Sequence, residues 1–184
     1  MKLLAFCLFL SALASGAPPA QIILLRHGEK PDDADAEHLS ARGKERALAL
    51  VSLLGRGAPL THNAPVAALY ATRITKHNRS QRTGETLAPL SKDLALPVNM
   101  AYDSDNYSLL VRSVLNNPAY SGKTVIVCWT HHDIAQLAAA FGVRPGPDHW
   151  KEKTFDRLWI ITYREGRVEL RDAPQRLLKG DAKS

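Results

Sequence analysis

Cysteine is scarce in this sequence: Cys7 and Cys128 are the only two in 184 residues, which excludes a disulfide scaffold. Aromatic residues make up only 7% of the chain, and it has neither a low-complexity tract nor a collagen-like period. The remaining composition, 45% hydrophobic and 23% charged, is that of a globular protein. A chain of this length corresponds to about one domain, and it can bury a core without a disulfide or metal to hold it.

The chain also lacks a hydrophobic run of the ~20 residues that a membrane-spanning helix needs. Its apolar run at residues 3–10 is short, follows Lys2 and precedes small residues at 11–17. This order is typical of a secretory signal peptide, with cleavage expected after Ala14 or within a few residues of it. A retained membrane anchor is the alternative. We therefore expect residues 1–17 to be removed, a single domain at 18–184, a periplasmic or secreted location and no stable membrane anchor after cleavage.

The net charge of +6 favours anionic partners. The basic residues gather between positions 73 and 82, but they lack the interleaved aromatic residues of a nucleic-acid-binding surface. We therefore expect no nucleic-acid partner.

Hydrophobic patterning predicts strands that alternate with helices. Continuous apolar runs predict buried strands at 21–25, 66–71 and 124–129. Helical spacing predicts helices that start after Ser40, at about 79 or 82, at 107 and near 134, and two further runs predict a hairpin at 158–163 and 168–171. This alternation indicates an α/β fold, a three-layer α/β/α sandwich whose mostly parallel central sheet has an antiparallel edge strand.

Charged side chains follow the three predicted parallel strands. Arg26 and His27 come directly after the first, His131 follows the strand at 124–129, and the basic run that ends at Arg82 follows the strand at 66–71. Ligands bind beyond the carboxyl ends of strands in open α/β sheets. Guanidinium groups bind phosphate oxygens, and a neutral imidazole can attack phosphorus. If the three strands are neighbours, the sequence predicts a phosphate pocket.

The chain resembles the histidine phosphatase superfamily, whose fold is phosphoglycerate mutase-like. The segment at 26–29, Arg-His-Gly-Glu after an apolar strand, is similar to the signature of that family. Three further segments match in the same order: residues 39–47, residues 82–97 and the strand and helix around His131. Together the matches extend from about Ile22 to Tyr163.

The resemblance implies a phosphomonoesterase in which His27 is the nucleophile and becomes a phosphohistidine. Arg26, Arg82 and His131 would bind the phosphoryl group, and neither a metal nor another cofactor would be needed. The expected partner is a small phosphorylated substrate or inorganic phosphate. His132 competes with His131 for this role, and Ile134, three residues after His131, favours His131.

Other site residues are open to two interpretations. Arg79 is either a second phosphate ligand or a solvated charge, and Gly28 and Glu29 are candidates for phosphate binding next to His27. Many family members use a carboxylate after the arginine helix as general acid, but residues 99–107 contain no Glu. Asp103 or Asp105 could serve instead, or could be turn residues.

Two alternatives to an efficient phosphatase follow from the same residues. Without a clear acid, the chain could be a catalytically weak phosphate-binding or envelope-associated factor. A zinc site at residues 131–133 is not favoured, because no second His or Cys lies at a suitable spacing.

Overall fold

The computed structural model describes residues 17–33, 35–164 and 166–182, so the predicted signal peptide lies outside the described residues except for Ala17. A central sheet of six strands has the order β3-β2-β4-β1-β5-β6. The strands are β1 (Gln21–Arg26), β2 (Val66–Thr72), β3 (Val98–Tyr102), β4 (Thr124–Trp129), β5 (Arg157–Arg164) and β6 (Arg167–Pro174).

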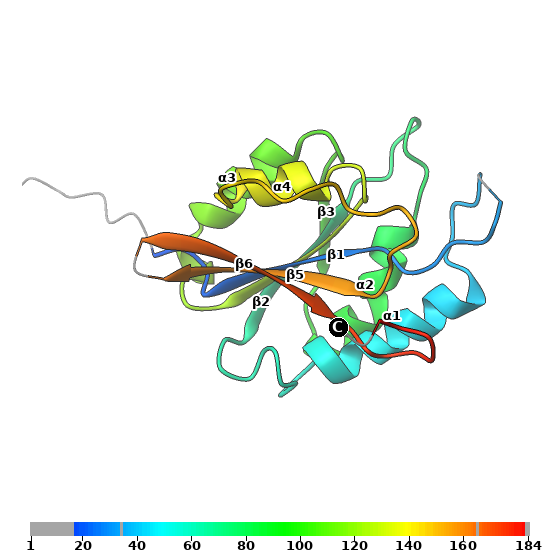
Figure 1. Ribbon diagram of the computed structural model, residues 1–184, viewed down its shortest axis with the longest axis horizontal. Helices are drawn as coiled ribbons and strands as arrows, with labels where there is room; N and C mark the ends of the chain where they lie inside the picture. The colour runs from blue at the N-terminus through cyan, green and yellow to red at the C-terminus, as the bar shows by residue number, and fades with distance from the viewer. Residues whose placement is uncertain (1–16, 34, 165, 183–184) are drawn as a thin grey trace, which may run out of the picture.

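Two pairs of helices cover the sheet, one pair on each face (Figure 1). Helices α3 (Tyr107–Leu115) and α4 (Ile134–Ala140) lie on one face, and α1 (Ala41–Leu54) and α2 (Arg82–Leu94) lie on the other. A short 3-10 helix, η1 (Pro118–Tyr120), follows α3. Ser40 begins α1, since its side chain accepts a hydrogen bond from the Gly43 N–H at 3.1 Å.

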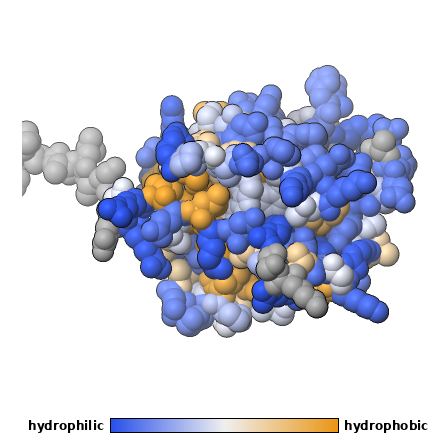
Figure 2. Space-filling model, viewed as in Figure 1, coloured by the Kyte–Doolittle hydropathy of each residue, from blue (hydrophilic) through white to orange (hydrophobic). Residues whose placement is uncertain are grey.

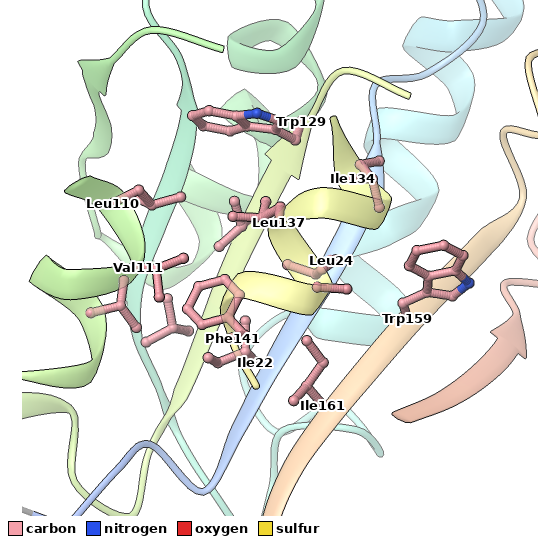
Figure 3. Close-up of a cluster of buried hydrophobic side chains, with 14 of the residues drawn as sticks. Ile22, Leu24, Leu110, Val111, Trp129, Ile134, Leu137, Phe141, Trp159 and Ile161 are labelled. Atoms are coloured by element: carbon pink, nitrogen blue, oxygen red, sulfur yellow. The ribbon is translucent and has the colours of Figure 1, made fainter. Parts of the chain in front are cut away.

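The core explains why β1 is a continuous apolar run. Ile22 and Leu24 pack into the cluster beneath α3 and α4 (Figure 3), whereas Ile23 and Leu25 pack into the cluster beneath α1 and α2. Because successive side chains of a strand point to opposite faces, a strand covered on both faces needs apolar residues at every position. The three-layer α/β/α architecture predicted from the sequence is confirmed.

The three strands that precede the charged residues are neighbours. β4 pairs in parallel with β1 on one side and with β2 on the other, and Arg26 is in register with Trp129. The carboxyl ends of these strands therefore meet at the same edge of the sheet.

The predicted hairpin lies at one edge of the sheet: β5 pairs antiparallel with β1, and the edge strand β6 pairs antiparallel with β5. One detail of the sheet differs from the prediction. The edge strand β3 is absent from the prediction because it is short and only half-buried, and its second residue, Asn99, weakens the strand pattern. Val98 and Met100 of this strand pack against the core beneath α1 and α2.

The face of the molecule in Figure 2 is mostly hydrophilic, with small hydrophobic patches. Across the described ranges, the exposed large hydrophobic side chains are Leu48, Ile74 and Leu109. None of the helices in these ranges is long and apolar enough to cross a membrane.

Candidate active site

Arg26 and His27 lie at the carboxyl end of β1 and are both buried, with 2% and 4% of their surface exposed. The guanidinium carbon of Arg26 lies 4.1 Å from the centre of the Phe155 ring, a cation–π contact. Its Nε and Nη1 atoms are buried without a hydrogen-bond partner among the described residues. Burying a guanidinium with two unpaired donors lowers the stability of the fold. Such a cost is typical of a residue that binds an anion.

The His27 ring is held in one orientation by its own loop. Its Nδ1 lies 2.7 Å from the carbonyl oxygen of Gly28, so Nδ1 carries the proton and donates it to that oxygen. The other ring nitrogen, Nε2, is then unprotonated in the neutral ring. The ring centre lies 5.9 Å from that of Phe155, so the same aromatic side chain packs against both residues.

A cavity of about 390 Å³ opens at this edge of the sheet. Arg26, His27, Arg82 and His131 line it, so the structure brings together the four residues that the sequence singled out. Its lining also includes Lys30, Asn78, Ser80, Ser104, Thr130, His132, Asp133 and Glu152. The cationic and hydroxyl groups of this lining suit an oxyanion.

Arg82 is the first residue of α2 and is fixed by two hydrogen bonds. Its Nε donates to the Ser80 hydroxyl and its Nη1 donates to the carbonyl of Ala36, each at 3.0 Å. Burial lowers the pKa of this guanidinium, which nevertheless stays charged at neutral pH. Arg82 thus brings a positioned positive charge to the same cavity as Arg26.

His131 follows β4 and stacks on His132, with the ring centres 3.8 Å apart. Burial lowers its pKa to about 4, and the positive charges of Arg26 and Lys30 and the neighbouring His132 contribute. His131 is therefore neutral near pH 7 when the cavity holds no anion.

Burial is also the main reason that the pKa of His27 falls to about 3, with smaller contributions from Arg26 and Arg82. The structure shows that removal from water contributes more than those neighbours do.

The low pKa of His27 predicts that the fold is sensitive to acid. In the unfolded chain the ring binds a proton below about pH 6.5, whereas the folded ring stays neutral until about pH 3. At about pH 5 this difference favours the unfolded state by roughly 2 kcal/mol. His27→Asn should therefore lose less stability than the wild type between about pH 7.5 and pH 5, as measured by urea denaturation. His62→Asn, at an exposed site, is the control, and equal acid losses in wild type and His27→Asn would contradict the prediction.

Arg79, Asp103 and Asp105 are not among the residues that line this cavity, which favours the second interpretation of each: a solvated charge for Arg79, and turn residues for Asp103 and Asp105. Arg79 is 71% exposed and forms an ion pair with Glu37. Asp103 forms an ion pair with Arg73 at 3.6 Å, and Asp105 is exposed to solvent. Because β3 extends to Tyr102, residues 103–106 form the turn after it, and from this turn it is Ser104 that reaches the cavity.

Gly28 and Glu29 are structural neighbours of the cavity, which corrects their assignment to phosphate binding. The Gly28 N–H donates to the Thr86 hydroxyl at 2.9 Å, and a Cβ at position 28 would lie 2.8 Å from the Gly43 carbonyl oxygen. Only glycine permits this close approach of α1 to the His27 loop. The Glu29 carboxylate faces away to Arg46, whose Nη2 donates to it at 2.7 Å.

The sequence did not identify Glu152, Ser104 or Phe155 as site residues. Glu152 stands between Lys151 and Lys153, a pattern that is typical of a solvated loop. Phe155 and Ser104 carry no chemical signal, and only the folding of their loops against β1 and β4 brings them to the site. Within the described residues, no group of three or more His, Cys, Asp or Glu side chains is placed to hold a metal ion.

Comparison with known proteins supports the fold. No family model and no curated protein matches the sequence. Among solved structures, a putative α-ribazole-5'-phosphate phosphatase from Escherichia coli K-12 matches with a TM-score of 0.51 and 16% identity, over 89% of this chain and 98% of that chain. The putative phosphohistidine phosphatase SixA from Agrobacterium tumefaciens matches with a TM-score of 0.45 and 15% identity, over 83% and 95% of the two chains.

The chain therefore has a phosphoglycerate mutase-like fold, the fold of the histidine phosphatase superfamily that its motifs resemble.

Proposed function

We propose that this chain is a metal-independent phosphomonoesterase that works through a phosphohistidine on His27. The observation that carries the proposal is the state of that ring: it is buried, it is kept neutral, and its proton is held on Nδ1 by the Gly28 carbonyl. Nε2 is thereby left as the nucleophile in a cavity that also contains Arg26 and Arg82.

The reaction has two steps. Nε2 of His27 attacks phosphorus, the bond to the ester oxygen breaks, and the leaving oxygen takes up a proton. Water then attacks the phosphohistidine, and inorganic phosphate leaves with His27 restored. The protein's task is to hold the three equatorial oxygens and neutralise their charge, and Arg26, Arg82 and His131 supply donors for this purpose.

A bound phosphoryl dianion changes the protonation of His131. Burial and, to a smaller extent, the neighbouring cations lower the pKa of this ring, and the two negative charges of the substrate shift it in the opposite direction. His131 then binds a proton and donates a charge-assisted hydrogen bond to a phosphoryl oxygen. Substrate binding is thus coupled to proton uptake.

A panel of phosphate esters tests the function directly. Purified protein should hydrolyse members of the panel, and a rapid quench at alkaline pH, followed by mass spectrometry, should locate a phosphoryl group on the peptide that contains His27. Turnover with the phosphoryl group on another residue would contradict the mechanism. Binding of inorganic phosphate without hydrolysis of any ester would instead favour the catalytically weak phosphate-binding factor.

With Asp103 and Asp105 outside the cavity, Glu152 and Asp133 are the carboxylates of its lining that could protonate the leaving oxygen. Asp133 accepts the Thr130 hydroxyl hydrogen at 2.6 Å, which engages it at the start of α4. Glu152 is exposed on the loop before β5. Its charge raises the pKa of Arg26, and this effect is larger than that of any other charged neighbour of Arg26. We assign the acid to Glu152, since the other candidate, Asp133, is already engaged by the Thr130 hydroxyl.

Glu152→Gln should therefore slow the hydrolysis of esters according to their leaving group. We expect kcat/KM to fall about 100-fold or more for an alkyl phosphate and by less than about threefold for p-nitrophenyl phosphate, whose leaving group needs no proton. Glu169→Gln, on β6, is the matched control. Equal losses for both esters would exclude the role, and a selective loss in Asp133→Asn instead would assign it to Asp133.

We also place this reaction outside the cytoplasm, as a periplasmic or secreted activity. The support is the order of Lys2, the short apolar run at 3–10 and the small residues before Pro18.

A further inference from the structure

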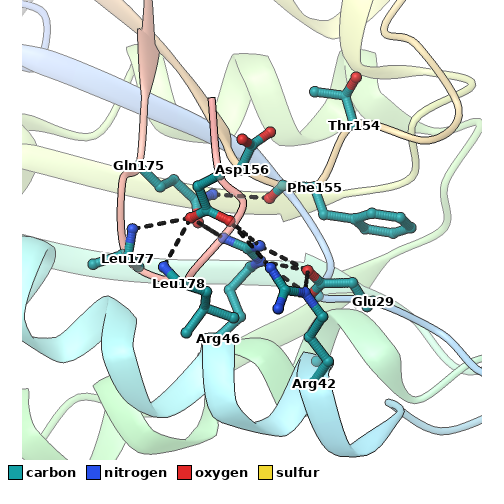
Figure 4. A network of polar contacts seen from close by, with 12 residues as sticks. Glu29, Arg42, Arg46, Thr154, Phe155, Asp156, Gln175, Leu177 and Leu178 are labelled. Atoms are coloured by element: carbon teal, nitrogen blue, oxygen red, sulfur yellow. Dashed lines mark hydrogen bonds and ion pairs between the residues drawn. The ribbon is translucent and has the colours of Figure 1, made fainter. Parts of the chain in front are cut away.

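The Arg46 side chain joins the loop after His27 to the C-terminal segment. Its guanidinium is 2% exposed and donates to Glu29 at 2.7 Å (Figure 4). The same group donates to the two carboxylate oxygens of Asp181 at 2.8 and 3.0 Å and to the side-chain oxygen of Gln175 at 3.0 Å. Arg46 therefore bonds to residues close to both ends of the described chain.

Asp181 organises the C-terminal segment, residues 175–182. Its side chain is 3% exposed, and its Oδ2 accepts the backbone N–H groups of Leu177 and Leu178 at 2.9 and 3.0 Å. The hydrogen bonds from Arg46 lower the pKa of this carboxyl to about 2. The carboxylate thus stays ionised and fixes both the turn at 177–181 and the guanidinium.

Gln175 connects the same network to Phe155, which packs against two residues that line the cavity. It is 4% exposed, and its Nε2 donates to the carbonyl oxygens of Phe155 and Arg157, each at 3.1 Å. Its backbone N–H donates to the Asp156 carbonyl at 2.7 Å. Phe155 is the residue whose ring packs against both Arg26 and His27.

We propose that the C-terminal segment is a positioning element for His27 and Arg26. One route runs from Asp181 through Arg46 to Glu29, two residues after His27, and the other runs from Gln175 to Phe155 beneath Arg26. Neither Gln175 nor Asp181 lines the cavity, so each acts through these other residues. The inference rests on the proposed function, since phosphoryl transfer requires His27 and the bound phosphoryl group to be held in line.

The test compares Asp181→Asn and Gln175→Leu in the full chain with a variant that is destabilised elsewhere. Val114→Ala removes fully buried apolar volume from α3, on the opposite face of the sheet from α1. All three are assayed well below their melting temperatures, with folding checked by circular dichroism. We expect kcat to fall about 10- to 100-fold in the two C-terminal variants, with a smaller change in KM, and to stay within about twofold in Val114→Ala.

Gln175→Glu separates the two routes. It keeps an oxygen for Arg46 but, when ionised, cannot donate to the Phe155 and Arg157 carbonyls. A loss of kcat like that of Gln175→Leu is expected if the Phe155 route positions Arg26.

Two results would overturn the inference while leaving the proposed function intact. They are wild-type kcat in both Asp181→Asn and Gln175→Leu, or an equal loss in Val114→Ala at a matched drop in melting temperature. If the wild type hydrolyses no ester, the proposed function fails instead. The affinity for inorganic phosphate, measured by calorimetry, then still tests the positioning of Arg26: it should weaken in Gln175→Leu, and an unchanged affinity would count against the inference.

Discussion

His27→Ala is expected to lower kcat by at least about 10,000-fold toward every phosphate ester that the wild type hydrolyses. The ring supplies the attacking Nε2, and among the described residues no other imidazole of the cavity is held like it. His27 is 4% exposed, with Nδ1 bonded to a carbonyl, whereas His132 is exposed and stacks on His131. Steady-state kinetics with p-nitrophenyl phosphate measures the effect, because that ester does not depend on the general acid.

His132→Ala serves as the control for this experiment. It removes a neighbouring imidazole of the same cavity, and we expect kcat to change by less than about tenfold because His132 is not the nucleophile. If His27→Ala keeps a tenth of the wild-type activity while His132→Ala loses nearly all of it, the nucleophile has been assigned to the wrong ring.

Arg26→Met is expected to change activity and stability in opposite directions. The guanidinium is buried, and its Nε and Nη1 lack hydrogen-bond partners among the described residues. Its loss should lower kcat/KM by about 100- to 1,000-fold, as removal of one preorganised donor to a reacting oxyanion does. The same change should raise the free energy of unfolding by about 1–3 kcal/mol, because an incompletely satisfied buried charge is replaced by an apolar side chain of similar length.

Kinetics and urea denaturation of the same samples, without phosphate, measure both effects. Added inorganic phosphate should then stabilise the wild type more than the variant, since Arg26 contributes to binding the ion only in the wild type. A variant that is both less active and less stable would show that Arg26 stabilises the fold. It would contradict the interpretation that Arg26 lowers the stability of the protein and is kept for ligand binding. Arg171→Met, at an exposed position on the edge strand β6, is the control.

Much of the secondary structure could be predicted because its signals are local. Ser40 begins α1 and Gly55 ends it, and α3 begins at the predicted residue 107. The apolar run of β1 is long enough for a strand and too short for a core helix. The edge strand β3 could not be predicted in the same way, because an edge strand is stabilised by its neighbour as much as by its own residues.

The site was predictable where it coincides with strand ends. Arg26, His27 and His131 each follow a buried apolar run, and parallel strands place their carboxyl ends together. Whether Asp103 and Asp105 reach the cavity could not be predicted, because the course of the chain after β3 depends on where that strand ends. Glu152 and Phe155 could not be found, since their loop carries no periodic pattern.

The sequence by itself determined that Arg26, His27 and His131 stand next to the ends of buried strands, because charged side chains beside an apolar run are a local feature of the chain. Only the tertiary structure decided how those residues are held: the neutral His27 ring, the unpaired donors of Arg26, and the link from Arg46 to Asp181 between segments 135 residues apart. Burial and long-range pairing depend on what the remaining chain places around a group. They form when the helices and loops pack against the sheet, and no local pattern in the sequence specifies them.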